Sequence, residues 1–169
     1  MAGEQQRREV AALYVSAREG VVRFLIASGL DPDKAEEATQ EAFLRLYSAL
    51  RNGEEIPQPK AWVYRVARNV AINSMKRGAG ESAFSEALEA TVASAELSAE
   101  KQLIERELIE SFREAMKHLS ERQRACLELR AQGLRFGEIA NVLGIQISTA
   151  AEYVRRGIEE LKKWSRTNN

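Results

Sequence analysis

The sequence of 169 residues contains one cysteine, one histidine and three prolines. A single cysteine, Cys126, excludes an internal disulfide and is typical of proteins in a reducing cytoplasm. The single histidine, His118, has no partners for a catalytic or metal-binding cluster, and the sequence shows no phosphate-binding loop. We therefore expect a protein that is not an enzyme and that holds no metal and no cofactor.

Long apolar runs and a signal sequence are also missing. The apolar stretches are short, such as Phe24-Leu25-Ile26, and cannot cross a bilayer. The first eight residues lead into no apolar signal core. The sequence therefore predicts a cytoplasmic protein without membrane insertion, and a hydrophobic content of 44% predicts a globular fold rather than disorder.

Basic and acidic residues balance at 25 each, but they are unevenly distributed. Residues 1–78 carry twelve basic and ten acidic side chains, residues 79–116 carry three and nine, and residues 117–169 carry ten and six. The neutral total therefore conceals two mildly basic ends around an acidic middle. Residues 60–77 contain five basic side chains and no acidic one.

Helical periodicity runs through most of the chain, and no strand-like alternation is long enough to predict a sheet. Apolar residues recur at three- and four-residue steps over 10–28, 32–50, 59–76, 98–118, 121–131, 135–143 and from 148 or 149 to about 164. Asp31 and Pro32 mark the start of the second helix, and Ser120 with Gln123 forms a capping box for the fifth.

We predict an all-α protein with two small helical domains. The first has three or more helices and covers residues 1–78. The second contains a helix-turn-helix and covers 105–169. A flexible acidic linker over 79–104 joins them, because its residues are small, polar and weakly periodic.

Residues 136–145 fit the first helix and turn of the helix-turn-helix unit. Ala140 supplies the small residue needed at a steep helix crossing, and Gly144 tolerates the positive φ of a sharp turn. The next helix would lie in the major groove with its first residues near base edges. The residues predicted to contact DNA are Arg135, for a phosphate, and Ser148, Thr149, Ala151, Glu152, Arg155 and Arg156.

Two alternatives remain open in this segment. The unit could be an ordinary helical hairpin packed in a core. Glu152 could accept a hydrogen bond from a cytosine amino group, or it could close a capping box with Thr149.

The acid-free stretch 60–77 combines basic side chains near helical spacing with interleaved aromatic residues. Such a face attracts phosphates and offers a stacking surface for unpaired bases. Trp62 could instead be a core anchor beside a solvated basic face. The absence of any acid favours DNA.

Two parts of the chain resemble the extracytoplasmic-function (group IV) sigma factors of bacterial RNA polymerase. Residues 33–47 (DKAEEATQEAFLRLY), followed by 60–69 (KAWVYRVARN), resemble their second conserved region. Residues 119–124 (LSERQR), with the later Gly133-Leu134, Glu138-Ile139-Ala140 and Leu143-Gly144-Ile145, resemble their fourth region. Both regions occur in order, without other domains between them.

The resemblance implies a sigma factor that binds the polymerase core and directs promoter-specific transcription initiation. The implied partners are promoter DNA and, on the polymerase, the clamp helices of the largest subunit and the flap; an anti-sigma factor is left open. Core binding is implied for Gln40, Glu41, Phe43, Leu44 and Tyr47. Recognition and opening of the −10 element are implied for Lys60, Trp62, Tyr64, Arg65, Arg68, Asn69, Asn73 and Lys76. The helix from 148 onward would recognise the −35 element.

The chain departs from the family pattern at Arg135-Phe136, Ala151-Glu152 and Asn73-Ser74, which leaves the promoter sequence open. One alternative function is a sigma-like mimic that sequesters an anti-sigma factor without binding DNA; the basic residues of 60–77 argue against it. Another is an operator-binding regulator, which would need a sensory or dimerising domain that the sequence does not show.

Overall fold

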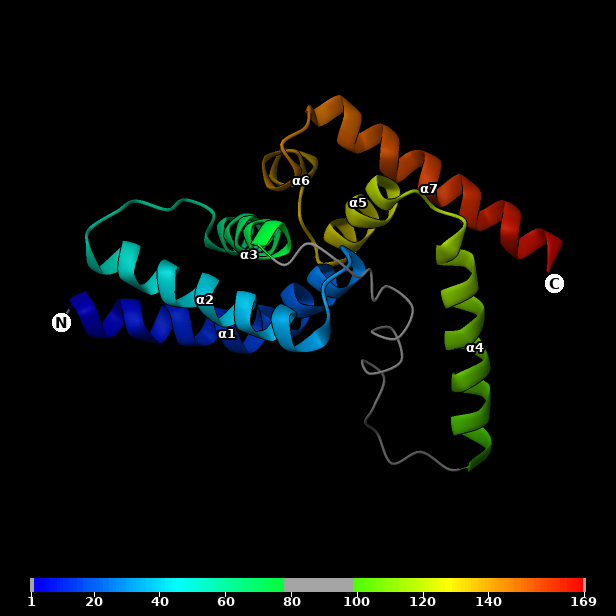
Figure 1. Ribbon diagram of the computed structural model, residues 1–169, viewed down its shortest axis with the longest axis horizontal. Helices are drawn as coiled ribbons and strands as arrows, with labels where there is room; N and C mark the ends of the chain where they lie inside the picture. Colours follow the sequence, from blue (N-terminus) through cyan, green and yellow to red (C-terminus); the bar gives the residue numbers. More distant parts are fainter. Residues whose placement is uncertain (1, 78–98, 169) are drawn as a thin grey trace.

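A computed structural model describes residues 2–77 and 99–168, and all regular structure in this part of the chain is helical (Figure 1). Its helices are α1 (Ala2–Ala27), α2 (Pro32–Arg51), α3 (Pro59–Arg77), α4 (Ala99–Lys117), α5 (Glu121–Ala131), α6 (Phe136–Leu143) and α7 (Ile147–Thr167). The predicted all-α fold is confirmed. Of the predicted linker, residues 79–98 lie outside the described residues, and 99–104 belong to α4. No described helix is long and apolar enough to span a membrane.

Helices α1, α2 and α3 pack on one another to form the first unit. Phe24 and Leu25 of α1, Leu46 of α2 and Val63 of α3 are fully buried in its core. The predicted start of α2 is confirmed: the Asp31 side chain accepts a hydrogen bond from the Lys34 backbone N–H at 3.0 Å, and proline follows in the first turn. A local cap therefore fixes the turn between α1 and α2.

Helix α1 begins eight residues before its apolar pattern does. Its first turns are polar, and their side chains are held by local and tertiary contacts. Arg8 pairs with Glu4 at 2.8 Å, and the Gln6 side chain donates to the Leu50 carbonyl at the end of α2, 3.0 Å away. The periodicity of apolar residues does not register such contacts.

Helices α5, α6 and α7 form the second unit, and α4 packs against α7. The capping box at α5 is present: the Ser120 hydroxyl accepts from the Gln123 N–H at 3.2 Å, and the Gln123 side chain accepts from the Ser120 N–H at 2.8 Å. Gly144 ends α6 with φ of +65°. Cys126 is completely buried, and burial raises the pKa of its thiol to about 11, as befits a core residue.

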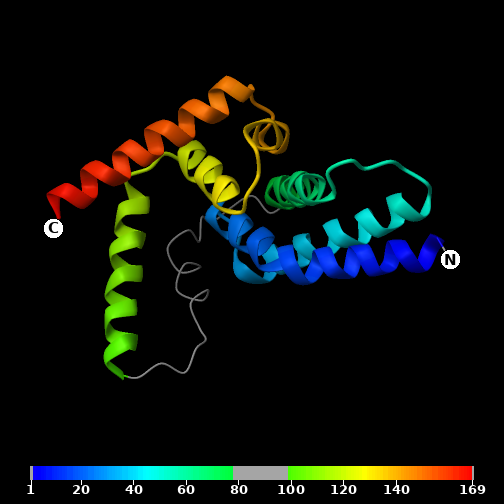
Figure 2. The ribbon, with the colours of Figure 1, turned by 180° about the vertical axis from the view of Figure 1, so that it is seen from behind.

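The two units contact each other through α3 with α6 and α1 with α5. Both views show α5 beside the end of α1, and α6 beside α3 (Figures 1 and 2). The Lys60 Nζ donates to the Gln132 carbonyl at 2.6 Å, and the Arg65 Nη1 donates to the Asn141 side chain at 3.3 Å. The domains predicted to be connected by a flexible linker are therefore in direct contact in this structure.

Close packing between α5 and α7 depends on Gly157. A Cβ atom at this position would lie 2.7 Å from Leu127 Cδ1 and 3.2 Å from its Cγ. At Gly137, which is also helical, a Cβ would meet only Ile147 Cδ1 at 3.8 Å. Gly157 thus leaves no room for a larger residue, whereas the site of Gly137 has room for a Cβ atom.

Alanine substitution should separate these two cases. We expect Gly137→Ala to raise the free energy of unfolding by roughly 0.5–1 kcal/mol, because alanine favours helix. Gly157→Ala should lower it by about 1 kcal/mol, because overpacking a buried crossing costs about 1–3 kcal/mol and exceeds the helix gain. Urea denaturation followed by circular dichroism measures both. An equal gain in both variants would show that α7 can move away from Leu127 without cost.

Candidate nucleic-acid interface

Helix α7 is the second helix of the helix-turn-helix. It begins at Ile147, one residue before the earliest predicted start, with Gln146 as its N-cap residue. Ala150, Val154 and Gly157 are buried against the rest of the unit. Because this inner face is fixed, the opposite face of the helix is directed to solvent.

The outward face of α7 carries most of the residues predicted to contact the −35 element. Ser148, Arg155 and Arg156 are exposed, whereas Thr149, Ala151 and Glu152 are half-buried. Ile147 is 59% exposed in the first turn and was not predicted as a contact. An apolar side chain beside the base edges suits the methyl group of thymine. An isoleucine directly after the turn, where no core position is needed, was the available sequence signal.

Glu152 forms ion pairs with two of the predicted DNA-binding arginines, Arg155 and Arg156. Its carboxylate accepts hydrogen bonds from Arg155 Nε at 2.8 Å and Nη2 at 2.7 Å, and from Arg156 Nε at 2.7 Å. Arg155 Nη1 also donates to Glu159 at 2.7 Å. These hydrogen bonds lower the pKa of Glu152 to about 2, so the carboxylate stays ionised near neutral pH.

The predicted alternative in which Glu152 closes a capping box with Thr149 is wrong. The helix begins at Ile147, so Thr149 lies inside the first turn and is not its N-cap residue. The carboxylate is already occupied by Arg155 and Arg156 on the next turn. The interaction with a cytosine amino group stays a prediction.

Arg135 is the N-cap residue of α6 and is exposed. Its backbone N–H donates to the Glu138 carboxylate at 2.6 Å, which stabilises the first turn of the helix. The Arg135 side chain therefore stands at a helix N-terminus facing solvent, where its predicted phosphate contact is sterically available.

The predicted −10 face on α3 is divided by the second unit. Asn69, Asn73 and Lys76 are exposed. Lys60 and Arg65 instead donate hydrogen bonds to the second unit, and Arg68 is half-buried.

The two predicted aromatic contacts on α3 are directed largely inward. Tyr64 is 0% exposed, and Trp62 is partly buried against the core. In this arrangement the residues predicted to bind the −10 element do not form one accessible surface.

The predicted polymerase-binding face on α2 is largely accessible. Gln40 is exposed, Leu44 is 65% exposed, and Glu41 and Tyr47 are half-buried. Phe43 is not on this surface: it is 4% exposed and packs edge to face on Tyr14, with ring centroids 5.0 Å apart. An exposed leucine beside polar side chains is typical of a protein-binding surface.

No cluster of three or more histidine, cysteine, aspartate or glutamate residues within 2–77 and 99–168 could hold a metal ion. Arginine, lysine, asparagine and serine side chains on two helices can bind phosphates and base edges.

The chain matches two protein families: Sigma-70 region 2 over residues 13–80 and Sigma-70, region 4 over residues 109–161. It is 28% identical over 134 residues to the RNA polymerase sigma factor SigZ of Bacillus subtilis, covering 79% of this chain and 73% of that protein. It is also 28% identical to the RNA polymerase sigma-H factor of Pseudomonas aeruginosa, covering 85% and 77%. The ferric citrate uptake sigma factor FecI of Escherichia coli is 27% identical, covering 74% and 72%.

The fold is similar to that of the sigma factor RpoE of Bartonella quintana, solved in complex with the anti-sigma factor NepR. The TM-score is 0.64 at 20% identity, and the match covers 94% of this chain and 97% of that one. Two family matches in the order region 2 then region 4, with relatives of this kind, establish the family. The chain belongs to the extracytoplasmic-function sigma factors of bacterial RNA polymerase, which direct promoter-specific transcription initiation.

Proposed function

We propose that this sigma factor recognises the −35 element through the outward face of α7 and the −10 element through α3. The observation that carries the proposal is the exposed row of Ser148, Arg155 and Arg156 on a helix whose inner face is buried. Arginine pairs with guanine edges and with phosphates in the major groove. Ile147, exposed in the first turn, adds an apolar side chain at the N-terminus of the helix.

Binding of the −10 element requires the two units to separate. Lys60 and Arg65 make hydrogen bonds to the second unit, and a side chain cannot contact DNA while α5 and α6 cover it. Asn69, Asn73 and Lys76 remain open to a first encounter with DNA. We infer that promoter recognition through α3 is completed in an open form of the protein.

Core polymerase binds the exposed side of α2 in this proposal, with Leu44 as the apolar anchor and Gln40, Glu41 and Tyr47 around it. The clamp helices of the largest subunit are the expected partner for α2, and the flap for the second unit. We place the protein in the cytoplasm, where polymerase works. An anti-sigma factor is a further candidate partner, because RpoE of similar fold is solved with NepR.

Run-off transcription with core polymerase tests this proposal, and Leu44→Asp tests the α2 surface. We expect promoter-dependent transcripts with the natural chain. Leu44→Asp should weaken core binding about tenfold or more, because a charge replaces an exposed apolar contact. Val15→Asp is the matched control, since Val15 is also highly exposed but lies on α1. Binding of an anti-sigma factor without any transcript would instead support the sigma-like mimic.

Arg155→Ala tests the −35 surface. We expect its affinity for a −35 duplex to fall about five- to a hundredfold, because a direct DNA contact is removed. The slope of log affinity against log salt concentration should fall by about one, the value for one lost phosphate contact. Lys163→Ala is the control on the same helix, since Lys163 pairs with Glu160 far from the first turns. Fluorescence anisotropy at several salt concentrations measures both. Equal losses in the two variants would mean that the helix binds DNA only by its general charge.

Glu152→Gln tests whether the carboxylate restrains the arginines. The pKa of Glu152 is lowered to about 2, so the ion pairs are complete at neutral pH and are lost only as pH falls through about 2. Glutamine should therefore raise the affinity for non-specific duplex about tenfold at low salt. The substitution removes the ion pairs that hold Arg155 and Arg156, and it removes a negative charge that the DNA phosphates repel. Glu160→Gln is the charge-matched control. A loss of −35 affinity without this gain would show instead that Glu152 accepts from cytosine.

A further inference from the structure

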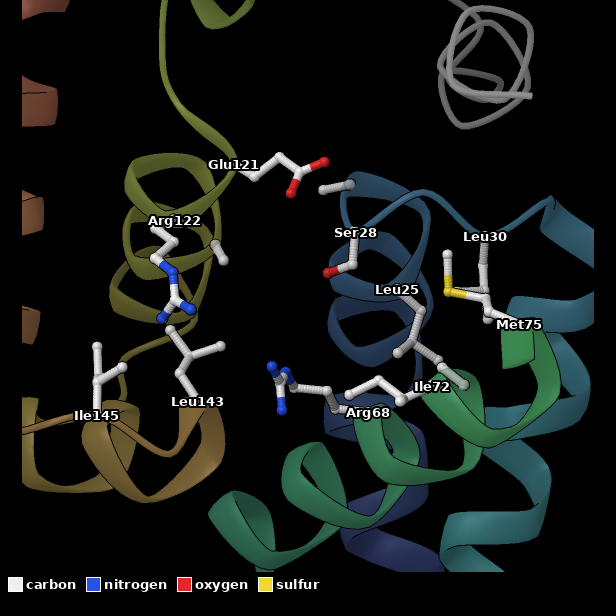
Figure 3. Close-up of a pocket in the computed structure, with 13 residues that line it drawn as sticks. Leu25, Ser28, Leu30, Arg68, Ile72, Met75, Glu121, Arg122, Leu143 and Ile145 are labelled. Carbon is white, nitrogen blue, oxygen red and sulfur yellow. The ribbon is translucent and has the colours of Figure 1, made fainter. Parts of the chain in front are cut away.

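A cavity of about 200 Å³ lies between the two units. Helices α1 and α3 form one side of it, and α5, α6 and the turn after α6 form the other (Figure 3). Its walls combine apolar and polar groups, and Leu25, Ile72 and Leu143 face the space (Figure 3). The cavity is open to solvent on one side, and because both units contribute its walls it exists only while the units are in contact.

Two guanidinium groups point toward each other across this cavity. Arg68 comes from α3 and Arg122 from α5 (Figure 3). Arg68 is half-buried and Arg122 is exposed, and neither is hydrogen-bonded or ion-paired to another described residue. Burial lowers the pKa of Arg68, and the positive charge of Arg122 lowers it further. The two like charges therefore oppose contact between the units.

The other polar groups at the cavity do not neutralise this pair. The hydroxyl of Ser28, directly after α1, donates to the Phe24 carbonyl at 2.8 Å. Glu121 is exposed at the mouth of the cavity, and its charge acts on Arg124 rather than on Arg68. An anion placed between Arg68 and Arg122 would satisfy both guanidinium groups at once.

The size and lining of the cavity define what such an anion must carry. An apolar cavity of about 150 Å³ can take up benzene, so this one has room for a single ring or a short branched chain. We propose that the cavity binds a small organic anion, an aromatic or branched-chain carboxylate, whose carboxylate bridges Arg68 and Arg122. The apolar body of the ligand lies among Leu25, Ile72 and Leu143.

Ligand binding is linked to closure, because both units contribute walls and charges. A ligand that binds only the closed form increases its population. In that form Lys60 and Arg65 are held by the second unit. The ligand would therefore oppose binding of DNA by α3; this consequence rests on the proposed function, whereas binding of the ligand does not.

Benzoate is the probe, and benzamide of nearly the same shape is its neutral control. Binding to the full chain, without polymerase or DNA, is measured by ligand-observed NMR. We expect benzoate to bind at least about tenfold more tightly than benzamide, because its charge contacts two arginines. Arg68→Gln and Arg122→Gln should each abolish that preference, and Arg7→Gln, a distant exposed arginine, should keep it. Equal binding of the two probes, or no binding of benzoate, would overturn the proposal.

Arg122→Glu places a carboxylate of the protein itself opposite Arg68, in the place proposed for the carboxylate of the ligand. We expect an ion pair with Arg68, a compact molecule without ligand and no remaining preference for benzoate. The natural chain should become more compact when benzoate is added, as measured by the radius of gyration in small-angle X-ray scattering. Arg7→Glu is the matched control, and Arg122→Gln gives the same test of binding if the glutamate variant does not fold. No change in size of the natural chain at saturating benzoate would overturn the link to closure.

These measurements are independent of transcription. A chain that binds benzoate selectively but produces no transcript would contradict the proposed function alone. A chain that initiates transcription but does not distinguish benzoate from benzamide would contradict the cavity proposal alone.

Discussion

Tyr64 of α3 is buried in the first unit, and its hydroxyl lies near the side chain of Gln132 in the second unit. Its ring packs edge to face on Phe24, with centroids 5.6 Å apart, and its hydroxyl lies so close to Gly20 that a Cβ there would be 2.5 Å away. Among the described residues this buried hydroxyl has no hydrogen-bond partner, and its burial raises the pKa of Tyr64. A buried polar group left unpaired costs about 1–3 kcal/mol. The side chain of Tyr64 is therefore tightly packed, but its hydroxyl lacks a hydrogen bond.

In the proposed function, the contact between the two units must open before α3 can complete its contacts with DNA. The units are joined by packing of α3 on α6 and of α1 on α5, with polar contacts from Lys60 and Arg65 at the edge. Single hydrogen bonds of this sort contribute about 0.5–1.5 kcal/mol. An unpaired hydroxyl and two facing arginines oppose them. A partner that binds only the open form can therefore shift the population with modest binding energy.

Most of the helices could be predicted because their ends are set by local interactions. The caps at Asp31 and Ser120 involve residues three positions apart, so the sequence displays them directly. The start of α7 was placed too late because Gln146 caps it without a side-chain hydrogen bond. The role of Glu152 was missed for a similar reason: several partners are within reach on a helix, and the conformation of the arginines decides among them.

The sequence by itself determined the helical class, the order of the two regions and the positions of the basic faces, since these follow from periodicity, caps and local charge. Only the tertiary structure decided which basic residues are accessible. Asn69 and Asn73 remain exposed on α3 while Tyr64 is buried and Lys60 is held by the second unit. The reason is that Tyr64 packs on Phe24 of α1 and Lys60 bonds to Gln132 at the end of α5. These partners are far away in the sequence and leave no periodic mark on the α3 sequence.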